Sequence, residues 1–235
     1  MLVLAIDTAT KIGSVALYHS EDGLLGEINI NARTNHSAII MNLIKQIFLL
    51  TGYKVDNVDR IAVTVGPGSF TGIRIGIAVA KGLAYSLDKE IVGMNQLDMI
   101  ANLCEYRKEE IIPMIDAKNN RAYYSKYHYQ NKENIVRDME YSVGDITNFF
   151  EVLNRDKSYV FVGDGAINNK DLIHNYFNGN EIIFSDVNSI PKSSIVGKMA
   201  IQKMADNLYT LEAFYMNKPQ AERMKDEKSE HYKKK

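Results

Sequence analysis

The strongest chemical signal in the sequence is a glycine-rich loop, Gly66–Gly72, between an apolar strand and a helix. Such a loop brings free backbone N–H groups and a helix N-terminus together, an arrangement that suits an anion such as phosphate. It completes neither of two common phosphate motifs. Thr71 stands where the dinucleotide fingerprint has its last glycine, and the loop lacks the lysine of a Walker motif. The alternative is a tight strand-to-helix turn in which Thr71 caps the helix.

A second loop of this kind follows the first apolar strand, which ends at Asp7. A carboxylate followed by the hydroxyls of Thr8 and Thr10 can hold a metal-bound phosphate, or it can cap its own turn. A third glycine pair, in Gly163–Gly165, breaks a later strand in the same way. The candidate remnants of phosphate or nucleotide loops are therefore Asp7, Thr8, Thr10, Gly66, Gly68, Ser69, Thr71, Gly163 and Gly165.

The sequence predicts no metal site and no catalytic residue. His36 begins a helix, but a metal-binding pair on one helical face needs a second ligand four residues on, and that position is Ile40. Ser69 does not form a nucleophile elbow, because Pro67 occupies the first glycine position of that motif. The single cysteine, Cys104, follows an apolar stretch and is expected to be buried and unreactive.

Composition describes an ordinary globular protein. The chain has 235 residues, 46% of them apolar, and a formal net charge of −1, so it lacks the basic character of a protein that holds nucleic acid unaided. One cysteine excludes an internal disulfide framework, which fits a reducing compartment. No secretory leader pattern is seen, and no window approaches the ~20 apolar residues of a membrane span. We therefore expect a cytoplasmic protein without a membrane association.

The residue pattern predicts the same series of elements twice. Each half reads as three strands, a helix, a strand that ends in a glycine break, and a second helix. In both halves the first strand ends in an aspartate, Asp7 or Asp116. The strands predicted for the first half, beginning with an antiparallel meander, are Leu2–Asp7, Gly13–Tyr18, Leu24–Ile30 and Ile61–Val65, with helices over 35–50 and 71–86. Those predicted for the second half are Ile111–Asp116, Ala122–Tyr129, Ile135–Tyr141 and Tyr159–Val162, with helices over 145–153 and 170–177.

We interpret this order as an internal duplication in an α/β protein made of two βββαβα subdomains. The first is predicted to cover 1–108 and to be joined by a final helix over 194–208, and the smaller second to cover 109–190. A helix with Asn95 as its N-cap connects the two. The stretch 218–235 is almost entirely polar and is predicted to be a disordered tail.

The helix after the glycine loop carries a stripe of small residues at every fourth position, from Gly72 to Ala84. Glycine inside a helix lowers helix stability by up to about 1 kcal/mol relative to alanine. The stripe is therefore expected to serve the close approach of a neighbouring structural element. That neighbour is either the protein's own sheet or a helix of another subunit. We adopt the second interpretation, in which two such faces can also pair about a two-fold axis. The predicted partner interface is Gly72, Ile73, Gly76, Ile77, Ala80, Ala84, His36 and Ile40.

Three motifs resemble the TsaB (YeaZ-like) family of bacterial tRNA threonylcarbamoyladenosine biosynthesis proteins. They are Leu4–Thr10, the longer run Gly66–Gly76 and, near the end, Gln220–Glu222. The resemblance is specific over roughly the first hundred residues, and the turn Asp116–Arg121 departs from the family pattern. It implies an actin-like (ribonuclease-H-like) fold, which agrees with the duplicated order of elements.

The resemblance also implies a function as a partner subunit of the TsaD transferase, which places threonylcarbamoyl groups on tRNA. TsaD-like relatives carry a His-x-x-x-His pair on their first helix, where this chain has His36 and Ile40. A scaffold without activity of its own follows, with ATP and metal at the partner subunits TsaD and the ATPase TsaE. The resemblance further implies a homodimer in isolation and contact with tRNA only through the complex. Two alternatives stay open: a small-molecule phosphotransferase of the same superfold, and a metallopeptidase.

Overall fold

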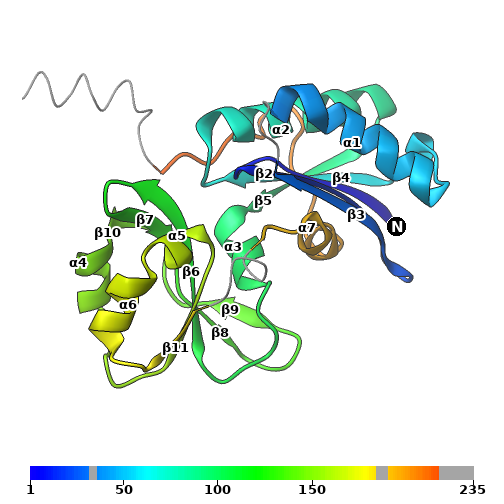
Figure 1. Ribbon diagram of the computed structural model, residues 1–235. Helices are drawn as coiled ribbons and strands as arrows, with labels where there is room; N and C mark the ends of the chain where they lie inside the picture. Colours follow the sequence, from blue (N-terminus) through cyan, green and yellow to red (C-terminus); the bar gives the residue numbers. More distant parts are fainter. Residues whose placement is uncertain (32–35, 184–189, 217–235) are drawn as a thin grey trace, which may run out of the picture.

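The computed structural model describes residues 1–31, 36–183 and 190–216, which form two α/β subdomains side by side (Figure 1). The predicted tail 218–235 and the motif Gln220–Glu222 lie outside the described residues. Within the described part of the chain, no helix combines the length and the apolar character needed to cross a membrane.

The first sheet has five strands in the order β3-β2-β1-β4-β5. The predicted meander is confirmed, because β1, β2 and β3 pair antiparallel, whereas β4 and β5 join β1 in parallel. The strands are β1 (Leu2–Asp7), β2 (Ile12–His19), β3 (Gly23–Asn31), β4 (Arg60–Gly66) and β5 (Glu90–Asn95). The helices that follow them are α1 (His36–Thr51), the 3-10 turn η1 (Val55–Asn57), α2 (Phe70–Leu87) and α3 (Gln96–Ala101).

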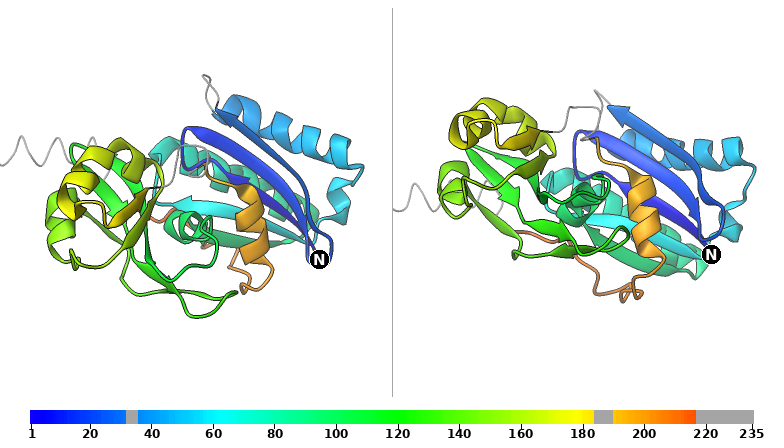
Figure 2. Two further views of the ribbon diagram at one scale, coloured as in Figure 1. Left: turned by 60° about the horizontal axis from the view of Figure 1, so that its bottom comes forward. Right: turned by 90° about the horizontal axis from the view of Figure 1, so that it is seen from below.

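Alternation along β1 explains which helices cover which face of this sheet. Leu4 and Ile6 point into one apolar cluster with α1 and α2. Val3 and Ala5 point to the opposite side, into a second cluster with α3 and with α7 (Ser193–Ala200). Figure 2 shows α7 crossing the sheet on the face opposite α1. β1 is therefore buried on both sides, as its uninterrupted apolar run requires.

The second sheet repeats the topology of the first, with the main strand order β10-β7-β6-β11-β12. This repetition confirms the duplicated, actin-like α/β fold. Its strands are β6 (Glu110–Lys118), β7 (Arg121–Tyr124), β8 (Tyr127–Tyr129), β9 (Ile135–Arg137), β10 (Ser142–Asp145), β11 (Tyr159–Val162) and β12 (Glu181–Ile183). Three helices accompany them: α4 (Ile146–Glu151), α5 (Asp164–Asn168) and α6 (Lys170–Phe177).

The predictions for strands two and three of this half are wrong in two respects. The expected strand Ala122–Tyr129 is split, and its second part pairs with β9 in a hairpin beside β6. The chain turns out of the sheet at Ser125, whose buried hydroxyl donates to the Met139 carbonyl. The third strand of the main path is β10, downstream of the predicted position.

The two subdomains share a continuous apolar core. α3 lies between the sheets, and its cluster includes Val3 of β1 together with Ile111 of β6 and Val160 of β11. Tyr127 and Tyr141 of the second subdomain donate from their hydroxyls to Asp98 of α3, at 2.6 and 2.7 Å. The subdomains are therefore packed against each other through α3.

Residues 201–216, here termed the C-terminal strap, run back along the first subdomain after α7. The predicted final helix extended to 208, but α7 ends at Ala200. The Arg60 guanidinium accounts for the ending, because Nη1 donates to the carbonyls of Ala200 and Lys203, at 2.6 and 2.7 Å. The strap then covers the edge strand β5, where the Asp206 carboxylate accepts from Gly93 N–H at 2.7 Å.

Candidate functional site

The Asp7 carboxylate lies at the carboxyl end of β1 and is fully buried. One of its oxygens accepts from Ala9 N–H at 2.9 Å and from the Thr64 hydroxyl at 2.7 Å. The other accepts from the Gln96 amide at 2.9 Å. These contacts join β1, β4 and the start of α3, so Asp7 acts as an internal hydrogen-bond acceptor of the first subdomain.

The two predicted phosphate loops of the first half meet in the structure, but they pack directly on each other. Ser69 N–H donates to the Ala9 carbonyl at 2.6 Å, and the Thr8 hydroxyl donates to the Gly72 carbonyl at 2.7 Å. A Cβ on Gly68 would stand 2.3 Å from the Ala9 carbonyl oxygen, so only glycine allows this approach. The space beside the Asp7 loop is thus filled by the glycine loop itself.

Ser69, and not Thr71, caps α2. The Ser69 backbone is extended, and its hydroxyl accepts from Gly72 N–H at 3.2 Å. The helix therefore begins at Phe70, whereas a cap at Thr71 would have made Gly72 the first helical residue. Asn95 does cap α3 as predicted, because its side chain accepts from Leu97 N–H. Thr10 closes its own turn through hydrogen bonds with Ile12.

The small-residue stripe of α2 is buried inside the protein, so its predicted contact with another subunit is wrong. A Cβ on Gly72 would lie 2.0 Å from the Thr8 carbonyl oxygen, and one on Gly76 would lie 2.4 Å from the Thr8 hydroxyl oxygen. The stripe therefore lets α2 approach the end of β1. The predicted interface residues Gly72, Ile73, Gly76, Ile77, Ala80 and Ala84, together with Ile40, are all buried. The His36 side chain lies outside what the structure describes.

The equivalent loops of the second half form a partly exposed polar cluster instead. Asp116 N–H donates to the Asp164 carboxylate at 3.0 Å, and the Asp116 carboxylate accepts from Lys118 and Asn168 at 2.8 and 3.0 Å. Burial acts to raise the pKa of Asp116, but the hydrogen bonds from Lys118 and Asn168 outweigh it and lower that pKa. Burial raises the pKa of Asp164, and the nearby Asp116 charge adds to the effect. Gly165 packs against the backbone of Ile115.

The sequence indicated a turn over Asp116–Arg121 but did not predict these contacts. The turn itself is present, since Lys118, Asn119 and Asn120 all have positive φ angles. The signal that pointed to the cluster was the repeated aspartate at the end of each first strand. Nothing in one sequence could show that Asn168 reaches it.

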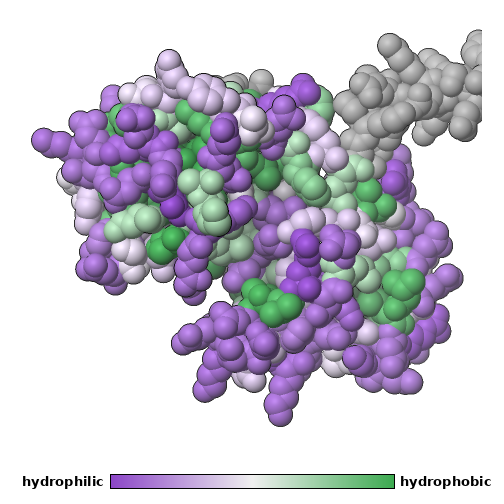
Figure 3. Space-filling model, turned by 180° about the vertical axis from the view of Figure 1, so that it is seen from behind, coloured by the Kyte–Doolittle hydropathy of each residue, from purple (hydrophilic) through white to green (hydrophobic). Residues whose placement is uncertain are grey.

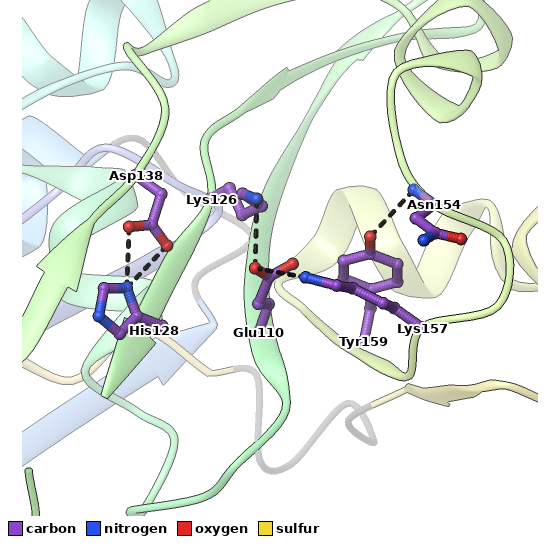
Figure 4. A network of polar contacts seen from close by, with 7 residues as sticks. All are labelled: Glu110, Lys126, His128, Asp138, Asn154, Lys157 and Tyr159. Carbon is purple, nitrogen blue, oxygen red and sulfur yellow. Dashed lines mark hydrogen bonds and ion pairs between the residues drawn. The ribbon is translucent and has the colours of Figure 1, made fainter. Parts of the chain in front are cut away.

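A second polar network lies at the opposite end of β6 (Figure 4). Glu110 accepts from Lys126 and Lys157 at 3.3 and 3.4 Å, and His128 contacts Asp138 at 2.8 Å. The paired residues come from strands of the sheet, from the β8–β9 hairpin and from nearby loops. The network therefore fastens the hairpin to the second sheet.

Other reactive groups are dispersed among the described residues. Nowhere in 1–31, 36–183 and 190–216 do three or more His, Cys, Asp or Glu residues gather in a way that could hold a metal ion. Burial raises the pKa of the Cys104 thiol to about 12, so this cysteine is predominantly protonated at neutral pH.

We predict that Asp7→Ala destabilises the protein by about 2–4 kcal/mol, because it leaves the Thr64 and Gln96 donors buried without an acceptor. Asp7→Asn is expected to cost about 1 kcal/mol or less. Among the described residues Gln96 Oε1 has no hydrogen-bond partner, so its amide can turn over and accept from the new side chain. Urea denaturation measures both changes. Metal-dependent ATP turnover that disappears in a stable Asp7→Asn variant would contradict this structural role.

Comparisons with known proteins agree on one family. The model of the TsaD family, tRNA N6-adenosine threonylcarbamoyltransferase, matches residues 13–225. A Bacillus subtilis relative, tRNA threonylcarbamoyladenosine biosynthesis protein TsaB, is 28% identical over 94% of this chain and 96% of its own. The Escherichia coli protein of the same description is 34% identical over 57% of each chain. The solved structure of YeaZ from Pseudomonas aeruginosa superposes with a TM-score of 0.73 at 20% identity, over 92% of this chain and 99% of its own.

Proposed function

The chain belongs to the TsaD protein family, among its TsaB members, and from this we propose that it binds and activates the TsaD transferase in threonylcarbamoyl modification of tRNA. The proposal assigns it no catalytic activity of its own. ATP and metal belong to the partner subunits, TsaD and a TsaE-like ATPase. In isolation the chain is proposed to pair with a second copy of itself through the face that TsaD otherwise covers.

The observation that carries this proposal is that the two first-half loops pack on each other and that Asp7 is held by internal hydrogen bonds. A transferring enzyme of this fold needs a carboxylate and backbone groups that face its substrate. Here the Asp7 carboxylate is committed to Thr64 and Gln96, and the glycine loop is packed on the Asp7 loop. Ile40, at the position of the second histidine of TsaD-like relatives, is fully buried among apolar residues. These features support a subunit that works by binding.

We propose that the binding surface lies on the exposed side of α1 and α2, in place of the buried stripe. Leu49 and Leu50 at the end of α1 are 70% and 74% exposed, and Tyr85 near the end of α2 is 69% exposed. These exposed apolar side chains lie on two helices that contact each other, and exposed apolar surface of this kind is typical of an interaction site. Ala78 and Gly82 form a second run of small residues on this side of α2, where another helix could approach.

Gly82→Arg is predicted to abolish association with TsaD while the protein stays folded. A Cβ at Gly82 meets nothing within 4 Å, so the change adds bulk only to the proposed interface. Replacing this helical glycine should also stabilise α2, by about 0.5–1 kcal/mol. Co-elution with purified TsaD on a sizing column measures association, and threonylcarbamoyl transfer to tRNA by the mixture measures activation.

Val152→Arg provides the matched control. Val152 is also 69% exposed, but it lies in the second subdomain at the end of α4. This variant is expected to bind and activate TsaD normally. If Gly82→Arg binds TsaD as well as the unchanged protein does, the proposed surface is wrong. If the unchanged chain does not stimulate transfer by TsaD, the proposed function is wrong.

A further inference from the structure

Two stacks of arginine on aromatic rings meet at the end of the C-terminal strap. In the first stack, the Arg74 guanidinium carbon lies 3.8 Å from the centre of the Phe70 ring. Arg74 Nε also donates to the Tyr215 hydroxyl at 2.8 Å, and the Phe70 and Tyr215 ring centres are 5.0 Å apart. This stack joins the first turns of α2 to the strap.

The second stack belongs to the other subdomain. The Arg137 guanidinium carbon lies 3.9 Å from the centre of the Tyr141 ring, and Phe214 packs against Tyr141 with ring centres 5.5 Å apart. Phe214 and Tyr215 are consecutive, so the strap places the two stacks next to each other. We name the set Phe70, Arg74, Arg137, Tyr141, Phe214 and Tyr215 the arginine–aromatic ladder.

The ladder is exposed in a way that a purely structural contact would not require. Phe214 is 38% exposed and Tyr215 is 42% exposed. Its surface adjoins the point where the described chain ends, and in Figure 3 apolar surface is visible beside that point. Phenylalanine is normally among the most deeply buried side chains, whereas tyrosine is intermediate. These rings therefore remain available to a partner.

The ladder carries two positive charges, and the carboxylates of Glu140 and Asp98 lie near one of them, Arg137. Arg137 has a single long ion pair, 3.5 Å from the exposed Glu140. Among the described residues, no carboxylate lies within ion-pair distance of Arg74. The neighbouring carboxylate, Asp98, already accepts from the hydroxyls of Tyr127 and Tyr141. Each of the two guanidinium groups thus has one face on an aromatic ring, Arg74 in the first subdomain and Arg137 in the second.

We propose that the ladder binds an unstacked, single-stranded stretch of RNA, with bases stacking on the rings and guanidinium planes and phosphates near the two arginines. This proposal rests on the proposed function, because the RNA it would meet is the tRNA substrate, and it replaces the expectation that the chain contacts tRNA only through the complex. Planar groups next to positive charge are the chemistry of single-stranded nucleic-acid sites.

Fluorescence anisotropy with a labelled ten-nucleotide single-stranded RNA tests the proposal, using the full chain alone and bound to TsaD. Arg74→Lys and Arg137→Lys keep the charge but remove the planar stacking surface. Each is expected to weaken binding by about fivefold or more, as is Tyr215→Leu. Arg155→Lys is the control, because Arg155 stacks on Tyr176 in the same way, at 3.8 Å, outside the ladder. It is expected to bind RNA normally.

Three results would overturn the proposal: no RNA binding by the unchanged chain, equal binding of a duplex of the same sequence, or no effect of the lysine variants. Loss of TsaD association in Arg74→Lys, with RNA binding unchanged, would make the ladder a protein-docking surface instead. The proposed function fails separately. If the unchanged chain does not stimulate transfer by TsaD while Arg74→Lys still weakens RNA binding, the proposed function is wrong and the ladder stands.

Discussion

Gly76→Arg is expected to prevent the protein from folding, and not merely to disrupt an assembly. The Cβ atom alone would lie 2.4 Å from the Thr8 hydroxyl oxygen and 3.4 Å from a Val63 methyl carbon. The rest of the arginine would have to enter the contact between α2 and β1, or force the helix away from the sheet. We expect a loss of about 4 kcal/mol or more, which is comparable to the whole stability of many domains. Circular dichroism during thermal unfolding measures it.

Gly82→Arg is the matched control for this experiment, since the same substitution on the same helix meets open space. It is expected to melt at or slightly above the temperature of the unchanged protein. A folded, stable Gly76→Arg monomer would contradict the packing of α2 on β1 described above. It would also restore the interpretation of the glycine stripe as a contact surface between subunits.

Arg60→Met is the second substitution for which we expect a large effect. Arg60 is buried, and its Nη1 donates to the carbonyls of Ala200 and Lys203, while Nε donates to Glu90. Methionine keeps much of the side-chain volume but has no donor. The end of α7 would lose its capping charge and leave a buried carbonyl without a partner. We expect a loss of about 3 kcal/mol in the free energy of unfolding.

Urea denaturation measures the Arg60→Met effect, and Glu90→Gln separates its two parts. The Glu90 side chain is 53% exposed, so weakening its ion pair should cost less than about 1 kcal/mol. A similar loss in Glu90→Gln and Arg60→Met would mean that the ion pair, and not the capping of α7, accounts for the effect. In that case the strap would not depend on Arg60 for its position.

The order of elements could be predicted well because each depends on residues close in sequence. The apolar run of β1, the helical spacing of α1 and the glycine break after β4 are local patterns. The β8–β9 hairpin could not be predicted, because the split at Ser125 depends on a hydrogen bond to Met139. The end of α7 likewise depends on a side chain 140 residues earlier in the sequence.

The candidate site was predicted only as a set of residues. The sequence indicated Thr8, Gly68 and Ser69 as loop residues, and their two loops do come together through contacts with Gly72 and Ala9. It could not distinguish two loops that face a ligand from two loops that face each other. The two cases differ only in the distance between the two loop backbones, and residue spacing in the sequence does not determine that distance.

The sequence by itself determined the α/β class, the duplication and the family, because period, punctuation and motif are properties of neighbouring residues. Only the tertiary structure decided which side of each element is free. The stripe from Gly72 to Ala84 is equally suited to a sheet or to a partner helix, and the approach of Thr8 decides for the sheet. The same holds for the arginine–aromatic ladder, whose members come from three distant segments. Their proximity is set by long-range packing, which acts between residues whatever their separation along the chain.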